Sequence, residues 1–310
     1  MVDWPFHLGE LEAHVRAGGG ARGGAIHQAM PDQHRAFFEA LPFVVVASID
    51  RVDGWPVATI LAGEPGFIRA PDARTLQIAA ALAPSDPAAR AFVPGTPFGL
   101  LGIELATRRR NRANGVIARA DDAGIVVAIE QSFGNCPQYI HPRELHRAEP
   151  GRGSTERFDG LDRTAAAAIA RADTFFVATS ARTDEPTGGV DVSHRGGPAG
   201  FVRIDGAVLT IPDFKGNRYF NTLGNLVSEP RAALLFIDFA TGDLLHVQGT
   251  TEIRWDGPEV RALEGAERLW RVRVERGWRR RAALPLRWHD GSKAASHSPR
   301  SSAVAIESAR

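Results

Sequence analysis

The segment VSHRGGPAGFVRIDGAVLTIPDFKGNRYFNTLGN, residues 192–225, decides how this chain folds. Two apolar runs in it flank Asp205 and Gly206, a pair typical of a tight two-residue β-hairpin turn. The run that follows, YFNTLGNLVSEP at 219–230, indicates a helix that ends at its proline. We therefore expect a strand, a hairpin and a helix in this order, with basic residues at both ends of the hairpin.

This segment has a counterpart in the first half of the chain. PGFIRAPDARTLQIA at 65–79 matches AGFVRIDGAVLTI at 199–211, and GLLGIEL at 99–105 matches ALLFIDF at 233–239. Three matched pairs are 134 positions apart: Gly66 and Gly200, Leu101 and Leu235, and Gly115 and Gly249. A fourth pair, Phe43 and Phe175, is 132 positions apart. A nearly constant offset predicts that the two halves share one fold.

Each half contains short runs rich in Val, Ile, Leu and Phe between Gly, Pro and Asp turn signals. The pattern predicts a mainly β protein with peripheral helices and one small barrel in each half. The expected parts are a helical N-terminal extension at 1–40, a first barrel at 41–150, a linker at 151–160, a second barrel at 161–288 and a disordered tail at 289–310.

Composition narrows the class of protein. The chain has 310 residues, a formal charge of +1 and a 44% hydrophobic content, which are ordinary values for a soluble protein of about two domains. A single cysteine, Cys136, excludes an intramolecular disulfide and a cysteine-built zinc site, and no metal site is predicted. No apolar run reaches the roughly 18 residues of a membrane helix, so we expect a cytoplasmic protein that binds neither membrane nor nucleic acid.

Polar residues that suit an anion lie at both ends of the hairpin. Ser193 and Arg195 are two positions apart, so a strand directs both to one face and His194 to the other. The hairpin brings the turn after it back beside them, and this turn supplies further donors: Lys215, the Gly216 amide, Asn217 and Arg218. Charge-assisted hydrogen bonds of about 1.5–3 kcal/mol each would hold a phosphate ester at this strand-to-helix turn.

The sequence of this region resembles the FMN-binding split β-barrels of the pyridoxamine 5'-phosphate oxidase-like superfamily, in particular a branch with two barrels per chain. The likeness spans most of residues 28–288, and four stretches carry it: EPRAALLF, IPDFKGNRYFNTLGN, RRRNR and QSFGNCPQYI. It implies two tandem split barrels that form an internal pseudo-dimer, with FMN at the interface between them.

The resemblance also implies roles for single residues. Arg195 takes the place of the strand arginine that holds the FMN phosphate, and Lys215, Asn217 and Arg218 take the place of the turn group. The positions that meet the flavin ring correspond to Pro212, Asp213 and Gln248. The turn PDFKGNR replaces the oxidase's Tyr-Thr and Ser-Arg-Lys, and its C-terminal substrate-phosphate residues have no counterpart, so vitamin B6 oxidation is not implied.

An internal pseudo-dimer needs a second wall from the first half. The first-half counterpart of VSHRGG, VATILAGEPG at 57–66, lacks Arg and Lys, so we expect one flavin per chain or one composite site. The expected wall segments are RRRNRANG at 108–115 and FGNCPQYI at 133–140, from which we select Asn135, Cys136 and Tyr139.

Plainer interpretations remain open for several of these residues. Arg195 on its own could be a solvated strand residue, His194 is more typical of a turn or hydrogen-bonding wall than of a catalytic base, and Cys136 is more typical of a small buried side chain. We assign no catalytic residue.

The functional hypothesis is a flavin-dependent oxidoreductase that acts on a small molecule or electron acceptor. The alternatives are a non-catalytic flavin carrier or sensor, an electron-transfer partner of a reductase, or a protein that binds a deazaflavin or haem. A monomer with an internal pseudo-dimer and a homodimer are both compatible with the sequence.

Overall fold

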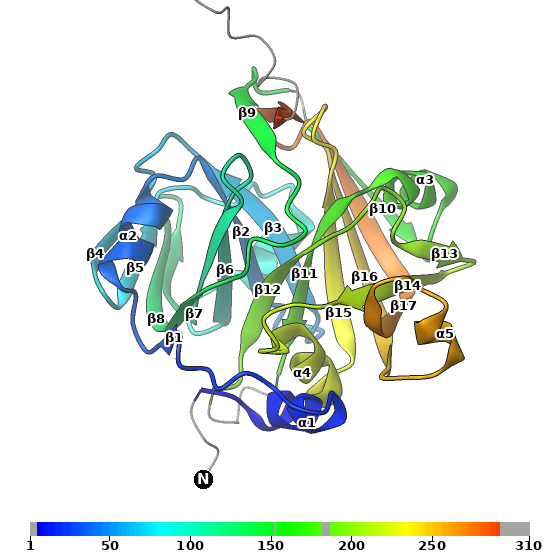
Figure 1. Cartoon of the computed structure of the whole chain (residues 1–310). Coiled ribbons are helices and arrows are strands. Elements are labelled where there is room, and N and C mark those ends of the chain that lie inside the picture. The colour runs from blue at the N-terminus through cyan, green and yellow to red at the C-terminus, as the bar shows by residue number, and fades with distance from the viewer. Residues whose placement is uncertain (1–4, 152, 182–186, 292–310) are drawn as a thin grey trace, which may run out of the picture.

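The computed structural model describes residues 5–151, 153–181 and 187–291 (Figure 1). Each half forms one large antiparallel sheet. The first sheet contains β1 (Ile26–His27), β2 (Phe43–Ile49), β3 (Pro56–Ala62), β4 (Ile68–Asp72), β5 (Thr75–Ile78), β6 (Pro97–Glu104), β7 (Arg109–Asp121) and β8 (Gly124–Gly134). The second contains β10 (Ser154–Asp159), β11 (Thr174–Ser180), β12 (Val190–Gly196), β13 (Arg203–Asp205), β14 (Val208–Phe214), β15 (Arg231–Ile237), β16 (Leu244–Arg254) and β17 (Ala266–Arg281).

The two sheets have the same strand order. The first runs β3-β2-β6-β7-β8-β5-β4, with β1 beside β8, and the second runs β12-β11-β15-β16-β17-β14-β13, with β10 beside β17. Each strand of the first half therefore has one equivalent in the second. The prediction of a mainly β chain with two tandem barrels of one fold is confirmed.

Short helices and one small sheet surround the barrels. The helical elements are α1 (Leu8–Arg16), α2 (Asp32–Glu39), the 3₁₀ helix η1 (Pro87–Ala91), α3 (Arg163–Arg171), α4 (Asn221–Ser228) and α5 (Pro258–Arg261). Strands β9 (Arg143–Arg147) and β18 (Leu286–Asp290) form the two-stranded sheet. None of the helices in the described part of the chain is long and apolar enough to span a membrane.

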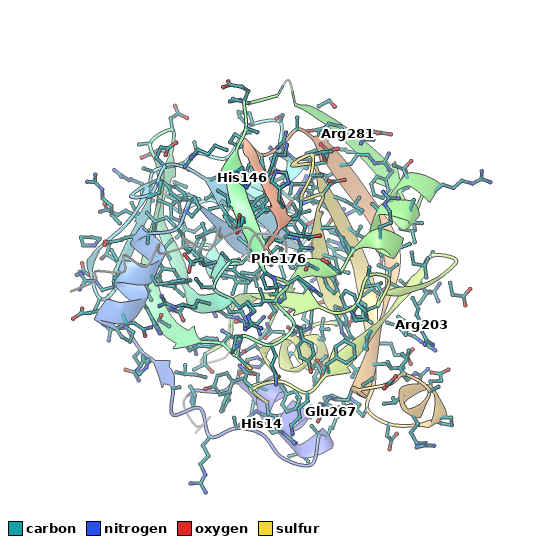
Figure 2. The ribbon with its side chains drawn as sticks, turned by 45° about the horizontal axis from the view of Figure 1, so that its top comes forward. His14, His146, Phe176, Arg203, Glu267 and Arg281 are labelled. Carbon is teal, nitrogen blue, oxygen red and sulfur yellow. The ribbon has the colours of Figure 1, made fainter. Side chains whose placement is uncertain are left out.

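The strands at the centre of the molecule are buried on both faces. In β2, Val44 and Val46 belong to the core of the first barrel, whereas Val45 and its alternate neighbours belong to a third apolar cluster shared by both halves. In β11, Val177 faces the second barrel's core and Phe176 faces the shared cluster. Figure 2 shows Phe176 near the middle of the molecule. Burial on two faces explains why these strands read as continuous apolar runs.

The same alternation corrects one of the matched pairs. Phe43 faces the shared cluster, but Phe175 faces the core of its own barrel. Two residues on opposite faces cannot be equivalent, because side chains alternate along a strand. The Phe43–Phe175 pairing was therefore wrong.

Matching β-bulges support the 134-residue offset elsewhere. The register of β7 against β8 shifts between Asn114 and Gly115, and that of β16 against β17 shifts between Gln248 and Gly249. A Cβ atom on Gly115 would lie 1.9 Å from the Ala128 carbonyl oxygen, and one on Gly249 would lie 2.2 Å from that of Arg273. Both bulges thus require glycine for close backbone approach.

The expected domain boundaries differ from the structure at three places. The extension at 1–40 contains strand β1 as well as helices α1 and α2. Within the expected linker, residues 154–159 form β10, paired with β17. Residues 289–290 of the expected tail end β18, and the tail from residue 292 onward lies outside the described residues.

Replacing either bulge glycine by alanine is expected to destabilise the protein. The added methyl group of Gly115→Ala or Gly249→Ala would overlap a carbonyl oxygen, at a cost of about 1–3 kcal/mol in the free energy of unfolding. Gly24→Ala is the control, since its Cβ would have no atom within 4 Å. Denaturant unfolding of the three variants measures this, and a bulge variant as stable as the Gly24 control would contradict the equivalence of the bulges.

Candidate functional site

A polar pocket lies between the two barrels. The second half supplies the end of β12, the turn after β14 and the start of α4, and the first half supplies β7 and the chain after β8. The lining residues from the second half include Ser193, His194, Arg195, Pro212, Asp213, Gly216, Asn217, Arg218, Asn221 and Arg268, and those from the first half include Arg110, Arg112, Asn135, Cys136 and Tyr139. The structure thus brings together most of the residues selected from the sequence.

Three arginines line the pocket, with Asp191 at 3.5 Å from Arg112 and Asp213 at 3.8 Å from Arg195. Arg110 and Arg112 point from β7 to one face, because they are two positions apart, and Arg195 comes from β12. Burial and mutual repulsion lower the pKa of Arg110 to about 9, and burial lowers that of Arg112 to about 10. Burial likewise lowers the pKa of Arg195. All three remain charged at neutral pH, so they give the pocket positive charge that suits an anion.

Arg112 connects the two halves. Its Nη2 donates to Ser193 Oγ at 2.6 Å on β12, and its Nη1 donates to Asn221 Oδ1 at 3.2 Å on α4. Thr222 Oγ1 also bonds Ser193 Oγ, at 2.9 Å. Asp191 lies 3.5 Å from Arg112 and is the one acidic group that offsets its charge at this distance in the described chain. Ser193 is therefore fixed by groups from both barrels.

His194 is neutral, with its tautomer set by an arginine. The side chain is 4% exposed, and Arg110 Nη1 donates to its Nδ1 at 3.0 Å. Because arginine has donors only, the proton of the neutral ring must be on Nε2. Burial and the nearby arginines hold the pKa of His194 well below its usual range. A ring in this tautomer has no free lone pair for iron, which argues against His194 as a haem ligand.

The turn after β14 contributes less positive charge than predicted. Lys215 is exposed and does not line the pocket. Arg218 lines it, but its guanidinium donates to the carbonyl oxygens of Ala17 at 2.9 Å and Gly19 at 3.1 Å, at the end of α1. The N-terminal helix has carbonyls without internal partners there, so Arg218 binds the N-terminal segment and not the pocket's centre. The turn group predicted to surround an anion is thus only partly assembled.

The remaining turn residues line the pocket through other contacts. Asp213 pairs with Arg268 at 3.0 Å and lies 3.8 Å from Arg195, so it reduces the positive charge on that side. Asn217 Nδ2 donates to Asn135 Oδ1 at 3.3 Å, which joins the turn to the first half. Pro212 and Gly216 lie in the lining without side-chain hydrogen bonds of their own.

The first-half wall contains all three selected residues. Arg110 Nε donates to the Cys136 carbonyl oxygen at 2.8 Å, which places this segment beside the arginines. The Tyr139 ring stacks on Phe214 with centroids 5.3 Å apart, and its hydroxyl donates to the Lys215 carbonyl oxygen at 3.1 Å. Since Tyr139 is 41% exposed, this aromatic pair closes the outer side of the pocket.

Gln248 does not line this pocket, contrary to the prediction. Its amide donates to the Pro56 carbonyl oxygen at 2.8 Å and accepts from Arg276 Nε at 2.7 Å. The reason is the crossed arrangement of the halves: the second barrel's β12 packs against the first barrel's β6, so the far wall comes from β7 and β8. Asn114, at the equivalent bulge of β7, does not line this pocket either.

The pseudo-equivalent position in the other barrel contains different residues. Thr59 of β3 stands 134 positions before Ser193, and His246 of β16 stands 134 positions after Arg112. His246 stacks on Trp278 with ring centroids 4.5 Å apart, and burial lowers its pKa to about 4. The strand arginine that would match Arg112 is thus replaced by a neutral ring.

A carboxylate already occupies this second position. Asp86, only 2% exposed, accepts from Thr59 Oγ1 at 2.6 Å and from Arg280 Nη1 at 2.7 Å. It also caps η1 by accepting from the Ala88 amide at 3.0 Å. The protein's own anion therefore binds the donors that an external anion would need.

Sequence reasoning missed several residues as individual members of the pocket, among them Arg110, Arg112, Asn221, Thr222 and Arg268. The signal for the first two was present, because the i, i+2 spacing in RRRNR directs them to one face of a strand. For Arg268 and Asn221 the sequence has no local signal of this kind. No cluster of three or more potential metal-ligating His, Cys, Asp or Glu side chains occurs among the described residues.

Comparison with known proteins assigns the second half to a family. Residues 161–292 match the family model described as pyridoxamine 5'-phosphate oxidase. No curated protein matches the chain.

Among solved structures, HupZ from Group A Streptococcus is 16% identical, covering 34% of this chain and 84% of that one, with a TM-score of 0.28. A provisionally assigned pyridoxamine 5'-phosphate oxidase from Corynebacterium glutamicum is 15% identical, covering 41% and 94%, with a TM-score of 0.29. A conserved hypothetical protein from Mycobacterium tuberculosis is 19% identical, covering 43% and 87%, with a TM-score of 0.24.

These structural similarities are too low to carry an argument, so the assignment rests on the family match and on the strand order of the two sheets. The second half of this chain therefore belongs to the pyridoxamine 5'-phosphate oxidase-like superfamily of split β-barrels, and the first half repeats its strand order.

Proposed function

We propose that this protein binds one FMN per chain in the pocket between its barrels and uses it in an oxidoreductase reaction on a small molecule. The observation that carries the proposal is the convergence of Arg110, Arg112 and Arg195, from both halves, on one pocket. Burying three guanidinium groups together is costly unless an anion neutralises them. The phosphate of FMN is such an anion, and family membership of the second half favours FMN over other phosphate esters.

The pocket has unsatisfied donors that fit a phosphate. Arg112 Nε, Arg195 Nε and the protonated His194 Nε2 are buried without a hydrogen-bond partner among the described residues. A buried donor without a partner costs about 1–3 kcal/mol, which a bound acceptor recovers. The residues present therefore fit the phosphate end of FMN.

Three aromatic residues that line the pocket are the candidates to contact the flavin ring. Tyr139, Phe214 and Phe220 line the pocket beside Pro212. The empty space is about 100 Å³, below the roughly 300–1,000 Å³ of small-molecule sites. Entry of the ring therefore requires the stacked pair of Tyr139 and Phe214 to separate and the bond from Tyr139 to the Lys215 carbonyl to open.

A bound FMN would supply the hydride or electron transfer, and the protein would position it. Arg112 and Ser193 would hold the phosphate end, and Arg110 would keep His194 neutral as a donor. Reduction of the bound flavin by NADH or NADPH, with turnover by oxygen or another acceptor, separates an oxidoreductase from a flavin carrier or sensor.

Loss of Arg195 is expected to weaken FMN binding. Arg195→Ala removes one charge-assisted bond, so the dissociation constant should rise by at least about tenfold. Arg203→Ala is the matched control, because Arg203 lies exposed on β13, at the other end of the strand order and at the edge of the molecule (Figure 2). Quenching of FMN fluorescence measures both, and equal affinity in the two variants would refute the phosphate site.

One FMN per chain is expected, because Asp86 already fills the pseudo-equivalent position. Purified protein should show a two-banded flavin spectrum, and heat denaturation should release FMN, identified by mass, in a 1:1 ratio to the chain. A ratio of two would contradict the closed second position, and a colourless protein that takes up no added FMN would contradict the proposed function.

A further inference from the structure

We propose that the N-terminal arm, residues 5–22, supports the ligand site without lining it, and that Glu10 on α1 is a positioning residue that couples arm docking to anion binding through Asn221 and Arg112. The inference rests on the proposed anion site but concerns a segment that does not belong to either barrel. Figure 1 shows α1 lying against α4, whose first turn lines the pocket.

The arm packs on α4 by backbone contact. A Cβ atom on Gly9 would lie 2.3 Å from the Gly224 carbonyl oxygen, and one on Gly224 would lie 2.5 Å from Glu10 Cγ. Glycine at both positions therefore lets the two helices approach more closely than side chains would permit. The arm and α4 form one packed unit.

The arm also holds the turn before α4. Arg218 and Phe220 both have positive φ angles, 59° and 61°, which are uncommon for residues other than glycine. Arg218 donates to Ala17 and Gly19 at the end of α1, and its own carbonyl oxygen accepts from the Ala21 amide at 3.1 Å. These bonds stabilise a strained turn whose residues line the pocket.

A buried hydrogen-bond chain leads from the arm to the pocket. Glu10 is 3% exposed, and its Oε1 accepts from Asn221 Nδ2 at 2.5 Å. Asn221 Oδ1 accepts from Arg112, which in turn donates to Ser193. The Glu10 carboxyl thus orients the Asn221 amide, and this amide in turn orients Arg112.

The protonation state of Glu10 affects this series of hydrogen bonds. Burial, followed by the nearby Asp191, raises the pKa of Glu10 to about 8, whereas bonds from the His7 amide and Asn221 and the charge of Arg112 oppose the rise. His7, on the same arm, lies 3.6 Å from the carboxyl. Two further charged groups, Arg51 and Glu130, line the cavity on the other side of Glu10. At neutral pH the carboxyl is therefore protonated and adds no negative charge near Arg112.

The pH dependence has a defined sign. Between pH 4.5 and about 8 the folded protein holds one more proton at Glu10 than the unfolded chain does, so this site makes the free energy of unfolding fall as pH rises. Above pH 8 an ionised Glu10 would compete for Arg112 and repel a bound phosphate. Anion affinity should therefore fall as Glu10 ionises.

The test compares wild type, Glu10→Gln and Glu12→Gln in the full-length protein. Glu12 is the matched control, since it makes the same change on the same helix but pairs with Arg16 at the surface. The dissociation constant for FMN is measured at pH 7 and at pH 8.5. For each protein, the constant at pH 8.5 is divided by the constant at pH 7. A loss of stability or affinity that is the same at both pH values cancels in this ratio. If a bound anion raises the pKa of Glu10 by about one unit, the ratio should be about threefold larger in wild type and Glu12→Gln than in Glu10→Gln.

The same ratio in Glu10→Gln as in wild type would overturn the proposal. A ratio in Glu12→Gln that falls as far as that in Glu10→Gln would also overturn it. If wild type binds no FMN, the proposed function fails, and inorganic phosphate replaces FMN as the probe, with stabilisation against heat as the readout. A phosphate effect whose pH dependence disappears only in Glu10→Gln supports the arm, and the absence of any phosphate effect overturns it.

Discussion

The structure depends on one apolar contact, the packing of β2, β3 and β6 against β11, β12 and β15 across the centre of the molecule. Residues of both halves, among them Val45, Leu101, Phe176 and Leu235, form a single buried cluster there. At roughly 25 cal/mol per Å² of apolar surface removed from water, such a cluster holds the barrels in one fixed relation. That relation places β7 of one barrel beside β12 of the other, which no single barrel could achieve.

At the edge of this contact, the repeated fold creates two equivalent positions, one at Ser193 and one at Thr59. The polar side chains around these two positions differ. On one side, Arg112 donates to Ser193 and Asn221 in a buried polar cluster. On the other side, the Asp86 carboxylate satisfies Thr59 and Arg280. In an internal duplication each half can change without changing the other, so one position can keep its ligand site while the other becomes a structural ion pair.

Much of this architecture could be predicted from the sequence, because repeats and hairpin signals are local. The 134-residue offset and the turn at Gly206 correctly indicated two halves of one fold. The error at Phe43 arose because a run of consecutive apolar residues does not reveal which face each one takes when both faces are buried. β10 was missed for another reason, since its exposed polar residues carry no burial pattern.

The site was predicted best where its residues lie close together in the sequence. Ser193, His194 and Arg195 follow one another along β12, whereas the arginines opposite them come from β7, more than 80 positions away, and their distance depends on how the barrels pack. Arg218 shows the converse: it lies in the right turn, but a helix near the N-terminus binds its guanidinium. A sequence pattern cannot indicate such competition between distant partners.

The central claim, that the buried arginines hold the phosphate of a flavin, is tested most directly by comparing FMN with riboflavin, which has the same ring system and lacks the phosphate. Two charge-assisted hydrogen bonds to the phosphate would make FMN bind about 100-fold more tightly than riboflavin at neutral pH. Equal dissociation constants for the two flavins would contradict the account, because the arginine cluster would then contribute nothing to binding.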